Sequence, residues 1–212
     1  MANHRATKPR VHFSMLRTYQ PADLITLANG AAGTTAILAL MSYLTVPEVW
    51  RLYLAIGLLV LALVFDIADG TIARRREEHS PFGQELDSLA DIVSFGVAPA
   101  VLAYALGMRG LFDGAILVYF VACGISRLAR YNVTAEELAD TRGKVKYFEG
   151  TPIPSSLILV AVLALCVYLG RIGDHLPLGV IEVAGARLHP FSLLFFVNGS
   201  TMISKTLKVP KW

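Results

Sequence analysis

The feature that most constrains the fold is a succession of apolar stretches, each about as long as a membrane is thick. Nearly uncharged runs recur at residues 22–44, 50–73, 84–106, 110–131, 152–171 and 188–206. A helix needs roughly 20 apolar residues to cross the hydrocarbon core of a bilayer. Charged residues make up only 17% of the 212 residues, whereas a soluble domain has about 25%. The pattern predicts an all-α integral membrane protein, a six-transmembrane-helix bundle.

The segments between these runs are short, which predicts one compact domain over residues 21–212. Residues 1–20 form a basic segment ahead of it, in which Val11, Met15, Leu16 and Tyr19 share one helical face. Such a face is typical of a short interfacial helix on an anionic leaflet. A disordered basic tail is the alternative interpretation.

Positive charge is distributed unevenly between the two ends of the predicted bundle. With the N-terminus in the cytoplasm, all 19 Lys and Arg residues face the cytoplasm except Arg51, Arg109, Arg171 and Arg187. Positively charged loops stay on the cytoplasmic side. We therefore expect both termini to be cytoplasmic. The basic residues are spread over that face, which argues against a nucleic-acid-binding patch.

Acidic side chains stand inside or at the ends of the second and third apolar runs. They are Asp66, Asp69, Asp87 and Asp91. A carboxylate at membrane depth is costly, by roughly 2.5–3.5 kcal/mol on insertion scales. Because four negative charges so close together need neutralisation, the sequence predicts a site for divalent cations. Hard oxygen ligands favour Mg²⁺ or Mn²⁺ over zinc.

The spacing of these acids predicts two helical faces that meet. Asp66 and Asp69 are i, i+3 on one helix, and Asp87 and Asp91 are i, i+4 on the next. Ser80 and Pro81 suit the start of the second helix. Two alternatives remain open: ion pairs with residues 74–76, which are all Arg, or a proton relay in a transporter.

A motif of fixed spacing joins these acids to nearby small residues. It reads Asp66-x2-Asp69-Gly70-x2-Ala73-Arg74-x8-Gly83-x3-Asp87-x3-Asp91. At every defined position it resembles the motif of the CDP-alcohol phosphotransferases. The resemblance implies six transmembrane helices, a homodimer and two divalent metals. It also implies transfer of a phosphatidyl-type group from a CDP-linked lipid to an alcohol, with release of CMP.

Longer stretches are similar to the bacterial and archaeal phosphatidylserine synthases. They are residues 84–100, 126–132, 147–154 and 208–211, with Thr26, Asn29 and Gly33 in the first span. This resemblance implies CDP-diacylglycerol and L-serine as substrates, in a prokaryotic cytoplasmic membrane. Glycerol 3-phosphate, inositol phosphate or choline as the acceptor, and a membrane transporter, are the alternatives.

The resemblance also implies roles for individual residues. Asp66, Asp69, Asp87 and Asp91 are expected to be metal ligands, and Asp91 also the general base. The nucleotide is expected to contact Asn29, Asp69, Gly70, Ala73, Arg74 and Gly83.

The acceptor is expected at the cytoplasmic end of the fourth span. Serine carries a carboxylate, which arginine binds in a bidentate manner. The candidate residues there are Arg127, Arg130, Asn132 and Lys146. Simple anchoring of the basic side chains at the membrane surface is the alternative interpretation.

Overall fold

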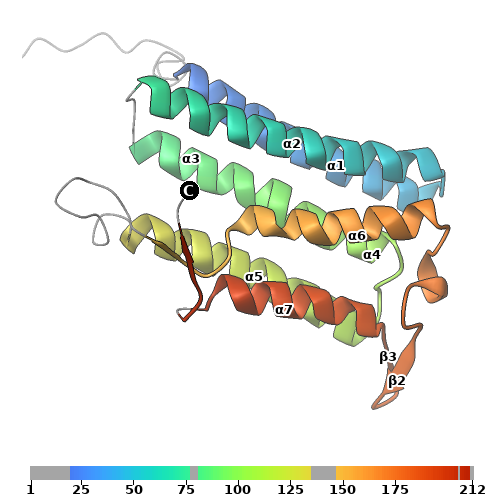
Figure 1. Ribbon diagram of the computed structural model, residues 1–212. Coiled ribbons are helices and arrows are strands. Elements are labelled where there is room, and N and C mark those ends of the chain that lie inside the picture. The colour runs from blue at the N-terminus through green and yellow to red at the C-terminus, as the bar shows by residue number, and fades with distance from the viewer. Residues whose placement is uncertain (1–19, 77–80, 135–146, 205, 211–212) are drawn as a thin grey trace, which may run out of the picture.

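Long helices lying roughly parallel or antiparallel make up most of the molecule in the computed structural model, which describes residues 20–76, 81–134, 147–204 and 206–210 (Figure 1). The first two, α1 (Pro21–Thr45) and α2 (Val49–Arg76), form an antiparallel hairpin. Pro21 occupies the first turn of α1, and the Gln20 backbone N–H donates to Asp23 at 2.9 Å. These features fix the start of α1 because they satisfy a free N–H of its first turn.

A third long helix changes its winding just after Asp91. It runs as α3 (Pro81–Asp91), a π-helical turn (Ile92–Val97) and α4 (Ala98–Ala105). Helix α1 packs on all three parts. Gly33 of α1 permits this, because a Cβ there would lie 2.8 Å from the Cα of Ser94. The helix starts at Pro81, as the sequence predicted.

The second half of the bundle consists of α5 (Leu111–Thr134), α6 (Ser156–Tyr168) and α7 (Leu193–Met202). Helices α5 and α7 pack closely, with the rings of Phe120 and Phe195 edge to face at 5.2 Å. Single 3₁₀ turns occur at Ile153–Ser155, Gly173–His175 and Pro190–Ser192. Cys123 and Cys166 are both buried and free.

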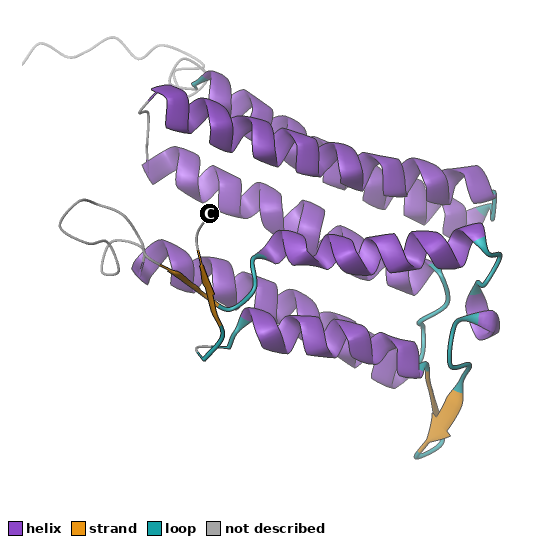
Figure 2. Ribbon diagram, in the orientation of Figure 1, coloured by secondary structure: helices purple, strands orange, loops and turns teal. Residues whose placement is uncertain are grey.

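Two short antiparallel strand pairs lie at opposite ends of the bundle (Figure 2). Strand β1 (Tyr147–Glu149) pairs with β4 (Lys208–Pro210), so the C-terminal segment lies against the segment that precedes α6. Strands β2 (Ile181–Val183) and β3 (Ala186–Leu188) form a hairpin between α6 and α7.

Four helices are long and apolar enough to cross a membrane: Pro21–Thr45, Val49–Ile72, Pro81–Ala105 and Leu111–Val133. They coincide with the first four predicted spans, and the chain is an integral membrane protein by this criterion. The other two predicted spans coincide with shorter helices, Ile153–Tyr168 and the 10-residue α7. The count of six spans therefore stays a prediction. The predicted interfacial helix of residues 1–20 lies almost wholly outside the described residues.

Candidate active site

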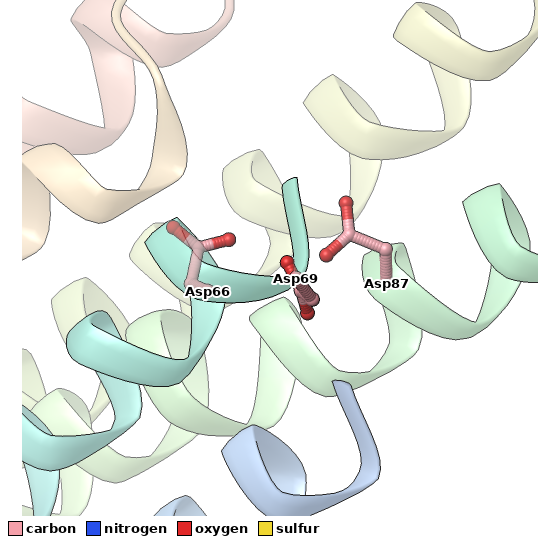
Figure 3. A group of neighbouring side chains, drawn as sticks. All are labelled: Asp66, Asp69 and Asp87. Atoms are coloured by element: carbon pink, nitrogen blue, oxygen red, sulfur yellow. The ribbon is translucent and has the colours of Figure 1, made fainter. Parts of the chain in front are cut away.

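Three of the four predicted acids converge between two antiparallel helices (Figure 3). Asp66 and Asp69 extend from α2, and Asp87 extends from α3. Each offers a carboxylate oxygen, and these oxygens all lie within 4.8 Å of one another. Asp69 is buried and the other two are half-buried. The spacing i, i+3 in α2 places its two carboxylates on the same face, opposite Asp87.

Helix α1 supplies the polar partners of this acidic group. The hydroxyl of Thr26 donates to Asp69 Oδ2 at 2.6 Å, and the Asn29 side-chain amide donates to Asp91 Oδ1 at 3.2 Å. Both α1 side chains are buried. The hydroxyl of Ser94, in the π-helical turn, donates to the Asn29 carbonyl at 3.0 Å. Helix α1 thus holds a carboxylate on each of the two acidic helices.

Asp91 is placed differently from the other three acids. It is the last residue of α3, it is buried, and it does not belong to the group whose oxygens lie within 4.8 Å. Its charge still interacts with those of Asp87, Asp66 and Asp69. The π-helical turn begins at the next residue. Such turns are rare and occur frequently at functional sites.

The donor set fits a hard divalent cation. Three carboxylates converge, and Oδ1 of Asp87 is buried without a hydrogen-bond donor among the described residues. A buried acceptor with no donor is destabilising by about 1–3 kcal/mol, and a cation relieves this. Oxygen-only ligands suit Mg²⁺ or Mn²⁺. The alternative pairing with residues 74–76 falls on side chains that the structure does not describe.

The predicted nucleotide-binding residues follow the same two helices. Gly70 of α2 and Gly83 of α3 are half-buried beside the acids. Ala73 and Arg74 continue α2 toward its end at Arg76, and their side chains lie outside the described part. Asn29 is wholly buried, and its Oδ1 has no partner among the described residues.

The structure brings some of the predicted acceptor residues to the acidic group and not others. Arg127 of α5 is half-buried, and its charge interacts with Asp91 and Tyr131. Its Nε is buried without an acceptor among the described residues. Asn132 instead exchanges hydrogen bonds with Ser88 of α3 at 3.1 and 3.3 Å. Arg130 is half-buried on the same helix, and Lys146 lies outside the described residues.

Two polar side chains at the site, Ser94 and Thr26, were given no role from the sequence. Thr26 lies i, i+3 from Asn29 in an apolar helix, and this spacing could have indicated a shared polar face. Ser156 Oγ and Asn198 Oδ1, on α6 and α7, are buried without partners among the described residues. Isolated polar residues at these positions gave no spacing pattern from which a site could be inferred.

Comparison with known proteins places this arrangement in a family. The CDP-alcohol phosphatidyltransferase family model matches residues 19–196. The chain therefore belongs to the CDP-alcohol phosphatidyltransferase family, a class of enzymes. The motif that resembled this family lies within the matched region.

Individual relatives carry more specific names. The chain is 46% identical over 208 residues to the CDP-diacylglycerol–serine O-phosphatidyltransferase of Saccharomyces cerevisiae, covering 97% of this chain and 75% of that protein. It is 36% identical over 143 residues to the archaetidylserine synthase of Methanothermobacter thermautotrophicus, covering 66% of this chain and 55% of the relative. A Methanocaldococcus jannaschii CDP-diacylglycerol–serine O-phosphatidyltransferase is 36% identical over 148 residues, 70% of this chain and 62% of the relative.

Proposed function

We propose that the chain transfers the phosphatidyl group of CDP-diacylglycerol to the hydroxyl of L-serine, forming phosphatidylserine and releasing CMP. One observation carries the proposal: three carboxylates converge on α2 and α3 within a chain of this family. Relatives from yeast and archaea that are named for serine or archaetidylserine synthesis support serine as the acceptor.

The acidic group would hold the metals. Asp66, Asp69 and Asp87 are the proposed ligands, with Asp91 completing a site for two Mg²⁺ or Mn²⁺ ions. Bound there, such ions neutralise the pyrophosphate charge and stabilise the departing CMP. Thr26 keeps Asp69 oriented through its 2.6 Å hydrogen bond.

Asp91 is the proposed general base. It accepts the proton of the serine hydroxyl as the serine oxygen bonds to the phosphorus of the phosphatidyl group. The bond from that phosphorus to the bridging oxygen breaks, and its electron pair leaves on the phosphate of CMP. Asn29 donates to Asp91 Oδ1 at 3.2 Å, which aims the carboxylate. A base must lie within hydrogen-bond reach of the proton that it removes.

The nucleotide and the acceptor would bind on either side of the acids. Gly70, Ala73 and Gly83 leave room for CDP, and Arg74 pairs with its phosphates. Arg127 is the first candidate for the serine carboxylate, because its buried Nε is unpaired among the described residues and its charge interacts with Asp91. Arg130, Asn132 and Lys146 are further candidates.

We also propose the arrangement in the membrane. The shorter helices α6 and α7 complete a six-span bundle, and two copies associate as a homodimer. Both termini and the acidic group face the cytoplasm, because the Lys and Arg residues predominate at that end.

Release of CMP by the purified protein tests the function directly. The protein is incubated with CDP-diacylglycerol and Mn²⁺, and serine, glycerol 3-phosphate, inositol phosphate and choline are supplied in turn. We expect serine to give the highest kcat/KM. A preference for glycerol 3-phosphate would refute serine as the acceptor, and no CMP release with any alcohol would refute the enzymatic function. CDP-archaeol in place of CDP-diacylglycerol tests the lipid.

A further inference from the structure

A polar cavity lies at the end of the bundle away from the acids. Its volume is about 280 Å³, and its lining includes Tyr43 of α1, Arg109, Gly110, Arg187 of β3 and His189. Residues 29 and 43 of α1 are about 21 Å apart at a rise of 1.5 Å per residue. This cavity is therefore separate from the catalytic group at Asn29.

The most informative lining residue is His189, which is only 2% exposed. Its Nδ1 lies 2.7 Å from Asp113 Oδ2, and its backbone N–H donates to Asp113 Oδ1 at 2.9 Å. The Asp113 carboxylate thus fixes both the ring and the backbone of His189. The other ring nitrogen, Nε2, is buried without a hydrogen-bond partner among the described residues. Buried polar atoms normally have partners, and a ligand or water beside this cavity-lining residue would satisfy Nε2.

The charges around the cavity favour an anion. The Arg109 guanidinium is held at the end of α4 by the carbonyls of Tyr104 and Ala105, at 3.1 and 3.0 Å. These two bonds use two of its five N–H groups. The Arg187 guanidinium bonds to Asp174, and their side chains are 54% and 67% exposed. An ion pair this exposed contributes little stability and exchanges partners readily.

The cavity also borders the start of α5, whose N-terminus carries partial positive charge. The Gly110 N–H just before this helix already donates to Asp113 Oδ2 at 3.0 Å, so this backbone group is not a donor to the ligand. A Cβ at Gly110 would collide with the carbonyl oxygen of Arg187, so glycine lets β3 approach this helix end. The guanidinium groups of Arg109 and Arg187 outnumber the carboxylate of Asp174 among the lining residues, and this balance disfavours a metal ion.

We propose that this cavity is a phosphate-binding site, in which His189 Nε2, Arg187 and Arg109 hold the phosphate of a lipid headgroup or free inorganic phosphate. The imidazole donates Nε2–H to the phosphate while its Nδ1–H donates to Asp113. Arg187 exchanges its exposed bond to Asp174 for the ligand. Both phosphate sources present the same oxygens, and the cavity lies toward an end of the bundle, where lipid headgroups lie in the proposed membrane arrangement.

Binding is measured on the full chain in detergent, with a chelator present so that metal-dependent binding at the acids is suppressed. Equilibrium dialysis with radiolabelled inorganic phosphate tests the free ion. Native mass spectrometry with phosphatidic acid, against diacylglycerol with the same acyl chains, tests the headgroup.

Two variants remove proposed ligands of the phosphate. His189→Asn keeps an amide N–H toward Asp113 and removes Nε2, and Arg187→Gln removes the positive charge of the Arg187 side chain. Arg171→Gln is the matched control, because Arg171 is exposed at the same end but does not line the cavity.

We expect the wild type to bind phosphate, or to retain phosphatidic acid in preference to diacylglycerol. His189→Asn and Arg187→Gln should each weaken this binding about tenfold, and Arg171→Gln should not. Phosphate binding points to the free ion, and selective retention of phosphatidic acid alone points to the headgroup. The proposal is overturned if neither probe binds, if His189→Asn binds like the wild type, or if Arg171→Gln weakens binding as much as Arg187→Gln. If His189→Asn does not fold, the comparison of Arg187→Gln with Arg171→Gln decides.

Discussion

Thr26 of α1 donates a 2.6 Å hydrogen bond to Asp69 of α2 in the interior of the bundle, where its side chain is 4% exposed. Three residues further along α1, Asn29 donates to Asp91 of α3. One face of α1 therefore orients a carboxylate on each acidic helix. The acids supply the negative charge, and the hydrogen bonds from α1 orient two of their carboxylates.

Replacing Thr26 by Val should lower CMP release about tenfold or more, because a hydrogen bond to a charged group is worth about 1.5–3 kcal/mol. Thr26→Ser keeps the hydroxyl and should recover most of the rate. Thr35→Val is the control, since Thr35 is exposed on α1 and its hydroxyl donates to the Ala31 carbonyl within its own helix. Equal rates for Thr26→Val and the wild type would show that the Asp69 bond does not matter for turnover.

Asp69→Asn and Asp87→Asn should each reduce CMP release by more than a hundredfold, because each removes a proposed metal ligand. Both changes keep the side-chain shape, and the amide oxygen introduced by Asp69→Asn would still accept the bond from Thr26. Glu85→Gln is the matched control on α3, where Glu85 is exposed. Either variant keeping more than a tenth of the wild-type rate, a loss under about 1.4 kcal/mol, contradicts the ligand assignment.

Exhaustive chelation should abolish activity, and Mn²⁺ or Mg²⁺ should restore it. Ca²⁺ should not, because it prefers longer bonds and more ligands than Mg²⁺. Activity is followed as CMP release after dialysis against a chelator and addition of each ion. Full activity in the chelated protein would mean that Asp66, Asp69 and Asp87 serve another purpose.

The convergence of Asp66, Asp69 and Asp87 could be predicted from the sequence because it depends on helical period alone. Two helices joined by a short polar segment bring their matching faces together where they pack. Asp91 lies apart from this group because it stands one helical turn beyond Asp87, about 6 Å further along α3, and the π-helical turn that follows it was not predicted. Nothing in residues 92–97 taken alone indicates that winding.

The long helices were also predictable, whereas the ends of the shorter ones were not. Hydropathy shows where apolar residues lie but does not show where a helix ends. Helix α6 ends at Tyr168, and Gly170 then adopts a φ of +67°. The apolar run at residues 188–206 likewise predicts a longer helix than α7, which has ten residues. A strand end and a 3₁₀ turn occupy the first residues of that run. The contact between Asp113 and His189 joins residues 76 positions apart, and no local pattern predicts such a pair.

Gly33→Ala should both destabilise the protein and slow turnover. The added methyl group would collide with Ser94, and overpacking of this kind is destabilising by about 1–3 kcal/mol. Separating α1 from the π-helical turn also shifts Asn29 away from Asp91. Gly57→Ala is the control, because a Cβ there meets nothing within 4 Å. Thermal unfolding in detergent and CMP release are measured together, and a Gly33→Ala protein as stable and active as Gly57→Ala would contradict the close approach.

Arg127 gives the sharpest test of where the acceptor binds. Its Nε is buried without an acceptor among the described residues, and its charge interacts with Asp91. A serine carboxylate bound there would satisfy the guanidinium and bring the serine hydroxyl near Asp91. Losing a charge-assisted bond of about 1.5–3 kcal/mol should raise the KM for serine about tenfold or more in Arg127→Gln. The KM for CDP-diacylglycerol should change far less.

Arg130→Gln is the comparison, since Arg130 lies one turn further along α5 and is also half-buried. Steady-state rates are measured with each substrate varied in turn, and thermal unfolding identifies variants that are merely unstable. A selective rise in the serine KM for Arg130→Gln alone would move the carboxylate site one turn toward the end of α5. Unchanged serine KM values in both variants would place the acceptor elsewhere, because serine binding in a folded variant would then depend on neither of these two charges.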